Sequence, residues 1–105
     1  LKVGRHFRLG ASFKLVVGRN QAENEKLKEF LREGDILFFP REGKGPLALG
    51  RGKVDESLLQ EAASLFAYYI RSHGEAVSVG VKFDSFGEVI EIERMSGEEV
   101  KKRMI

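Results

Sequence analysis

Alternation of apolar and polar positions predicts most of the strands in this chain. Phe13, Leu15 and Val17 alternate with Lys14, so one face of this extended segment is apolar. Residues 10–12, Gly-Ala-Ser, are turn-forming and join it to an earlier strand. Strands are predicted at residues 5–9, 13–19, 47–49, 77–83 and 88–93, and a short continuous apolar run predicts a further strand, buried on both faces, at 35–40.

Residues 21–33 have the apolar spacing of an amphipathic helix. Asn20 is suited to the N-cap, Glu23 completes an Asn-x-x-Glu capping pattern, and Gly34 provides the C-terminal stop. The predicted buried stripe consists of Leu27, Phe30 and Leu31, with Asn24 at its edge.

Residues 56–73 give the best-defined helix, with Asp55 at its N-cap and an apolar arc wide enough to cover a sheet. A short helix is predicted at residues 97–105, with Val100 and Met104 facing inward.

Together these elements predict a single α+β domain spanning residues 1–105. We expect a mixed sheet of about five or six strands, covered by the helices at 21–33 and 56–73, with a short C-terminal helix. The chain begins with Leu1 and shows no signal-peptide pattern, so we expect it to be the C-terminal part of a longer protein.

The composition excludes several kinds of chemistry. The chain has no cysteine, which removes disulfides, thiol nucleophiles and cysteine-containing zinc sites and fits a cytoplasmic location. No segment approaches the roughly 20 apolar residues of a membrane span, so no membrane partner is expected. We also expect no cofactor.

Charge is unevenly distributed although the net charge is only +2. Residues 1–54 carry 12 Lys and Arg against 6 Asp and Glu, whereas residues 55–105 carry 6 against 10. Such asymmetry indicates a surface for a polyanion, unless folding interleaves the two halves.

Glycines are dense between residues 43 and 52, but no phosphate-binding loop is complete. Gly52-Lys53 is followed by Val54, which lacks the hydroxyl of a Walker A motif, and no Gly-x-Gly-x-x-Gly occurs. Residues 50–53 precede a predicted helix and could hold an anion or form an ordinary glycine-rich connection.

The histidines give little support for catalysis. His6 and His73 lie near a strand start and a helix end, and no cluster of carboxylates accompanies them as metal ligands. We therefore expect this chain alone not to be an enzyme.

Basic residues instead gather at strand ends and loops, interleaved with phenylalanines, which is typical of surfaces that neutralise phosphates and stack on bases. Tyr68 is the one aromatic on the polar face of its helix, either as an RNA contact or as a half-buried tyrosine. The predicted contacts are Arg5, His6, Arg8, Arg19, Arg41, Lys44, Arg51, Lys53 and Tyr68.

A family resemblance sharpens this picture. The string Val-Val-Gly-Arg-Asn at residues 16–20, followed by Glu23-Asn24 and Leu27, resembles the signature of the NFACT RNA-binding domain, a module of ribosome quality-control proteins. Residues 35–38, Asp-Ile-Leu-Phe, and the Tyr-Tyr pair at 68–69 are also similar to family motifs. The resemblance implies RNA binding without chemistry of its own, and adds Asn20 and Asn24 to the predicted contacts.

Departures from the family pattern indicate a particular branch. Leu37 stands where the family has Trp, Phe39-Pro40 replaces a His-containing pair, and Leu47 replaces His after Pro46. These differences resemble the branch appended to PP-loop ATPases of the tRNA-thiolation type, which implies tRNA as the RNA and a preceding catalytic domain as a partner.

Three functions thus remain open from the sequence. The chain is an RNA-binding module of a tRNA-modifying protein, a protein-interaction or dimerisation module that docks a catalytic domain, or a domain that completes a sulfurtransferase active site with a base such as His6. The oligomeric state is not predicted.

Overall fold

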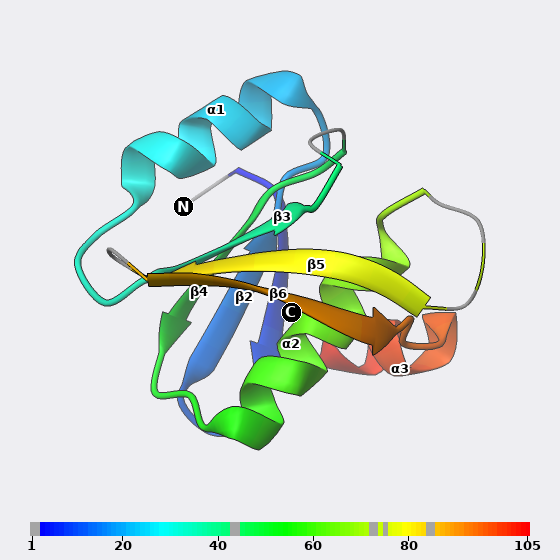
Figure 1. Ribbon diagram of the computed structural model, residues 1–105. Coiled ribbons are helices and arrows are strands. Elements are labelled where there is room, and N and C mark those ends of the chain that lie inside the picture. Colours follow the sequence, from blue (N-terminus) through cyan, green and yellow to red (C-terminus); the bar gives the residue numbers. More distant parts are fainter. Residues whose placement is uncertain (1–2, 43–44, 72–73, 75, 84–85) are drawn as a thin grey trace.

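The computed structural model describes residues 3–42, 45–71, 74, 76–83 and 86–105. Within these ranges the chain forms six strands and three helices (Figure 1). In chain order they are β1 (Arg5–Leu9), β2 (Phe13–Val17), α1 (Gln21–Phe30), β3 (Ile36–Pro40), β4 (Ala48–Gly52), α2 (Glu56–Tyr68), β5 (Ala76–Phe83), β6 (Phe86–Glu93) and α3 (Gly97–Arg103).

The strands form one sheet in the order β1-β2-β4-β3-β5-β6, and every neighbouring pair is antiparallel. The α+β class is therefore as predicted, but the expectation of a mixed sheet is wrong. Although α1 connects β2 to β3, these two strands are not neighbours, because β4 is inserted between them and runs antiparallel to both. The helix thus does not produce a parallel pair.

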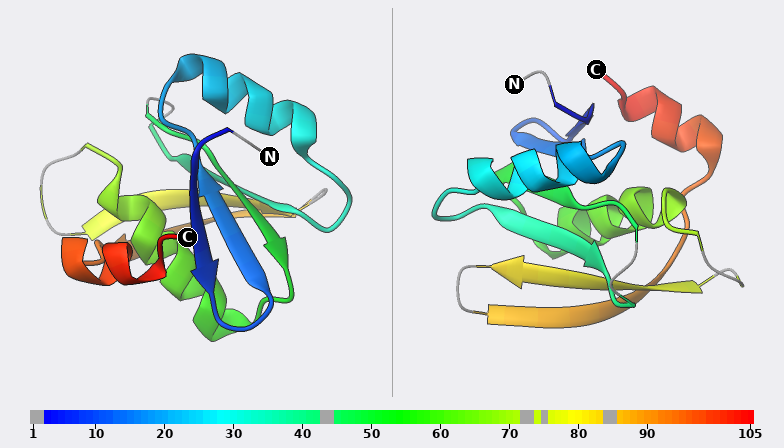
Figure 2. Two further views of the ribbon diagram at one scale, coloured as in Figure 1. Left: turned by 180° about the vertical axis from the view of Figure 1, so that it is seen from behind. Right: turned by 90° about the horizontal axis from the view of Figure 1, so that it is seen from above.

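The main core lies between the sheet and the helices α2 and α3. Phe38 on β3 packs against Phe66 on α2, with ring centroids 6.1 Å apart, and Val100 on α3 is buried in the same cluster. Both edge strands, β1 and β6, contact α2. The sheet therefore curls around this helix, as the view from above shows (Figure 2).

Helix α1 lies on the opposite, outer face of the sheet and covers only part of it. Leu27 packs there against Val16 and Leu49. Phe30 and Leu31, predicted to be buried beside Leu27, are 40% and 37% exposed, so that expectation is wrong. The helix ends at Phe30, because Leu31 is already extended.

A buried carboxylate organises the turn after α1. Asp35 accepts a hydrogen bond from the backbone N–H of Arg32 (2.9 Å) and donates its own backbone N–H to the Arg32 carbonyl (3.0 Å). This tight turn replaces the last helical turn that the apolar spacing had predicted up to residue 33.

Strand β4 extends through residues 50–52, where the sequence indicated a glycine-rich loop before a helix. Gly50 is needed because a Cβ there would lie 2.5 Å from the ring of Phe13 on the neighbouring strand. Asp55 caps α2 by accepting the Leu58 backbone N–H (2.7 Å). The glycines therefore belong to the sheet and not to the start of the helix.

The C-terminal ends of two predicted helices also differ. Helix α2 stops at Tyr68 instead of residue 73, and α3 stops at Arg103. Met104 was predicted to face inward, but its side chain is 48% exposed and its backbone bridges Phe7 on β1. The amphipathic pattern alone does not reveal that this residue leaves the helix and returns to a sheet edge.

The charge asymmetry of the sequence survives folding. Strands β1 to β4, from the basic half, are contiguous in the sheet, and the β5–β6 hairpin of the acidic half adds to one side. Folding therefore does not interleave the two halves within the sheet.

Candidate nucleic-acid interface

Three cations lie side by side across the open part of the outer face. The strand register places Arg8 opposite Lys14, and Lys14 opposite Arg51. Directly opposed residues of antiparallel strands lie about 5 Å apart at Cα. We call Arg8, Lys14 and Arg51 the cationic row. Like charges placed directly opposite destabilise a sheet, so this arrangement favours a bound anion.

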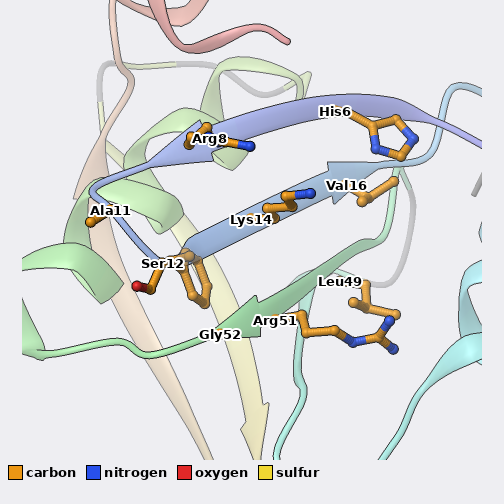
Figure 3. A pocket seen from close by; sticks show the side chains of 10 residues that line it. His6, Arg8, Ala11, Ser12, Lys14, Val16, Leu49, Arg51 and Gly52 are labelled. Atoms are coloured by element: carbon orange, nitrogen blue, oxygen red, sulfur yellow. The ribbon is translucent and has the colours of Figure 1, made fainter.

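The cationic row lines a hollow of about 560 Å³ that α1 leaves uncovered (Figure 3). His6 and Val16 continue the same face toward one end of the hollow, and Ser12 lies in the turn at the other. Among the described residues, no carboxylate pairs with Arg8 or Lys14. Both side chains are exposed and project from strands whose other face is core.

Arg51 differs from its two neighbours because it also holds the fold. Its Nε and Nη2 donate to the two carboxylate oxygens of Asp35 at 3.0 and 2.7 Å, and Nη2 also donates to the Phe30 carbonyl at 2.9 Å. The hydrogen bonds to Asp35 raise the pKa of Arg51. Asp35 is only 4% exposed in its side chain, while Arg51 is 41% exposed and can still present N–H groups outward.

The predicted contact Arg19 is also paired. Its Nε and Nη2 donate to Glu23 at 3.0 and 2.7 Å, and its backbone N–H donates to the same carboxylate at 2.9 Å. The Arg19 side chain, with smaller contributions from backbone N–H groups, lowers the pKa of Glu23 to about 2. Asn20 caps α1 as predicted, by accepting the Glu23 backbone N–H at 2.9 Å.

Asn24 has a structural position that the sequence did not indicate. Its Oδ1 accepts the Leu47 backbone N–H at 3.1 Å, and its Nδ2 donates to the Gly45 carbonyl at 3.4 Å. A Cβ at Gly18 would overlap this Oδ1. Glycine is thus required so that Asn24, which is 7% exposed, can connect α1 to the start of β4.

A second hollow, of about 430 Å³, lies where β1 begins and β2 ends. We call it the arginine hollow, since three arginines line it. Residues predicted to contact RNA meet here with residues that follow α2. The lining includes Arg5, Arg19, Asn20, Asn24, Tyr69 and Arg71.

The remaining predicted contacts are dispersed. Arg41 and Lys53 are exposed beyond the ends of β3 and β4. Tyr68 is 42% exposed, but it lies edge-on against Tyr69, at a centroid distance of 5.1 Å, close to α3. Lys44 lies outside the described residues. His6 Nε2 donates a hydrogen bond to the Val3 carbonyl (3.0 Å).

Sequence reasoning missed Lys14 and Arg71. Lys14 was seen only as the polar member of an alternating strand. The three-residue turn between β1 and β2 was the available signal, because pairing Leu9 with Phe13 places Arg8 opposite Lys14. Arg71 follows α2 and had no comparable signal, since only the folded chain brings it to Arg5.

Other kinds of site find no support in the part of the chain that the structure describes. No three His, Cys, Asp or Glu side chains there lie close enough together to hold a metal ion. None of its helices has the length and apolar character needed to cross a bilayer.

A similar fold occurs in another protein of known structure. A search of curated proteins finds no match. Among solved structures, the fold is similar to the C-terminal part of the fibronectin/fibrinogen-binding protein from Streptococcus suis, with a TM-score of 0.83 and 14% sequence identity. The match covers 100% of this chain and 51% of that one, so the present chain spans about half of its length. At this identity the likeness concerns the fold alone.

The family of this chain is identified from its sequence. Residues 4–104 match the family described as the NFACT protein RNA-binding domain, which is nearly the whole chain. This chain therefore belongs to the family of NFACT RNA-binding domains.

Proposed function

We propose that this domain binds RNA through the cationic row, and that the RNA is a tRNA presented to the catalytic domain of a larger, cytoplasmic, thiolation-type protein of the PP-loop class. The domain itself supplies binding and no catalytic group. The proposed site rests on the strand pairing, which places Arg8 opposite Lys14 and Lys14 opposite Arg51. The choice of tRNA and of the parent protein is supported by the sequence departures at Leu37, Phe39 and Leu47.

The cationic row carries positive charge that the described residues do not balance. Arg51 is neutralised by Asp35, but Arg8 and Lys14 have no such partner among the described residues. A phosphodiester backbone supplies anions in series and releases its counterions when cations replace them. The row crosses three strands held by backbone hydrogen bonds, so the backbone positions from which the cations project are fixed before RNA binds.

Binding of tRNA to the domain at about 150 mM salt tests this proposal. We expect R8Q/K14Q to weaken tRNA binding by roughly tenfold or more, since each lost phosphate contact removes a charge-assisted interaction. The matched control is K82Q/K101Q, which removes the same charge from exposed lysines on β5 and α3. Equal affinities for these two variants would contradict the proposed site. Equal affinity for tRNA and unrelated RNA would contradict the choice of tRNA.

A second function, docking to a catalytic domain, is favoured by exposed apolar side chains on the two faces of the β5–β6 hairpin. Phe86 is 61% exposed and Val89 is 51% exposed, and Phe86 packs against Phe83 with ring centroids 5.9 Å apart. The hairpin is at the far side of the sheet from the cationic row. F86S/V89T should then weaken association with the catalytic domain and leave RNA binding unchanged, as a pull-down and a binding titration would show.

A further inference from the structure

The arginine hollow is separate from the cationic row. Arg5 lies three residues before Arg8 on β1, about 10 Å along the strand, and alternation directs the two side chains to opposite faces of the sheet. Arg5 faces α2, where its guanidinium carbon lies 5.0 Å from the centre of the Tyr69 ring. The hollow therefore presents its charge at the end of the sheet, beyond the face that carries the row.

The Arg5 guanidinium is held in place before any ligand binds. Tyr69 beneath it is itself fixed, since its ring packs against Phe7 at 6.0 Å and against Tyr68 at 5.1 Å. Burial raises the pKa of the Tyr69 hydroxyl, so this hydroxyl stays neutral and adds no negative charge. A guanidinium stacked on an aromatic ring keeps its N–H edge available for an anion.

The other cations give the hollow a net positive charge. Arg71 is exposed, and no carboxylate among the described residues pairs with it or with Arg5. Arg19 is neutralised by Glu23, but that pair uses only Nε and Nη2, so the Nη1 group remains a donor. Among the described residues, no Asp or Glu lines the hollow. The guanidinium groups of Arg5 and Arg71, which no described carboxylate pairs with, and side-chain amide donors thus face a compact space.

We propose that the arginine hollow binds a terminal phosphate monoester of the RNA whose backbone lies on the cationic row. A monoester carries close to two negative charges at neutral pH and three acceptor oxygens, whereas an internal phosphodiester carries one charge. The guanidinium groups of Arg5 and Arg71 around a hollow match the monoester, while a linear row of cations matches the RNA backbone. This inference rests on the proposed RNA binding and adds a specificity for RNA ends.

The shared β1 strand makes the two sites compatible. Arg5 and Arg8 are about 10 Å apart along the strand but on opposite faces, so an RNA held at the row can reach the hollow within a few nucleotides by passing around the end of the sheet. The geometry does not distinguish a 5′-phosphate from a 3′-phosphate, because both present the same monoester group.

The test compares a short single-stranded oligouridylate in three forms: with a 5′-phosphate, with a 3′-phosphate, and with neither. We expect one phosphorylated form to bind the domain roughly tenfold more tightly than the unphosphorylated form, as a charge-assisted contact to a second negative charge should provide. Preference for either end supports the inference and identifies the terminus. Equal binding of all three forms would overturn it.

Variants separate this inference from the proposed function. R5Q/R71Q should abolish the preference and leave the unphosphorylated form bound as before, whereas R8Q/K14Q should weaken all three forms alike and keep the preference. If R5Q disturbs β1, R71Q alone keeps the test valid, since Arg71 is exposed and lies after the end of α2. A preference that survives R71Q and R5Q/R71Q would overturn the inference. Unweakened binding by R8Q/K14Q would overturn only the proposed row.

Discussion

The corner between β2 and α1 and the open strand face beside it are both polar and basic, but their polar groups are used differently. At the corner, Arg19 is paired with Glu23, and Asn24 bonds to the loop before β4. On the open face, Arg8 and Lys14 oppose each other across two strands. The family signature thus maintains the fold, and the unpaired charges next to it are the better candidates for contact with RNA.

The largest effect we expect is on stability at the corner. G18A should lower the free energy of unfolding by roughly 2 kcal/mol, because its Cβ would overlap Asn24 Oδ1. N24A should cost about as much, since it leaves the Leu47 backbone N–H without its acceptor. In the double variant the loss in the free energy of unfolding should be smaller than the sum of the two single losses, as urea unfolding would measure. Full additivity would show that Gly18 and Asn24 do not depend on each other.

Charge-neutral replacement at the corner should affect RNA binding far less than replacement on the open face. R19Q/E23Q removes one positive and one negative charge, so the affinity for RNA should stay within about twofold of the unchanged domain. R8Q/K14Q should lower it by roughly tenfold. Fluorescence anisotropy with one labelled RNA measures both variants. A larger loss of RNA affinity for R19Q/E23Q than for R8Q/K14Q would show that RNA binds at the corner and not on the open face.

Relief of like-charge repulsion should stabilise the free domain. K14T should raise the free energy of unfolding by about 0.5 kcal/mol, since it removes a cation that faces cations on both neighbouring strands. K82T is the matched control, because Lys82 is exposed on the same face but lies opposite Gly87. Both variants gain the strand preference of threonine, so the difference between them isolates the charge. No difference would mean that Lys14 costs the sheet nothing.

The smallest effect concerns the pH dependence of the corner. The pKa of Glu23 is lowered to about 2 in the folded domain, chiefly by its hydrogen bonds from Arg19. A carboxylate whose pKa falls on folding stabilises the fold above its unfolded value near 4.5 and loses this contribution as the pH falls toward 2. The stability difference between the unchanged domain and E23Q should therefore shrink over this range. A carboxyl NMR titration midpoint near 4.5 would contradict the pairing.

Local rules predicted much of the fold, and tertiary pairing determined the rest. The caps at Asn20 and Asp55 and the alternating strands follow from short-range preferences, and the structure contains them. The antiparallel insertion of β4 between β2 and β3 does not follow from short-range preferences, because it depends on which strands pair along their edges. Phe30 and Leu31 fit an apolar stripe in the sequence, yet Leu27 is the apolar side chain of α1 that packs in the buried cluster with Val16 and Leu49.

The candidate site was predictable only in part for the same reason. Clustering of basic residues in the first half drew attention to Arg8 and Arg51, but opposed charges are a property of strand register. Arg19 and Asn24 stood out because they lie in the most specific motif, and the structure uses their side chains within the fold. A search for residues that oppose like charges across the predicted β1–β2 turn would have found Lys14.

The salt dependence of RNA affinity tests the central claim most directly. For a single-stranded RNA, each phosphate contact contributes roughly 0.7 to the slope of log K against log salt concentration. If Arg8 and Lys14 each neutralise one phosphate, R8Q/K14Q should flatten this slope by about 1.4, and R19Q/E23Q should leave it unchanged. An unchanged slope for R8Q/K14Q would show that the open strand face is not where RNA binds.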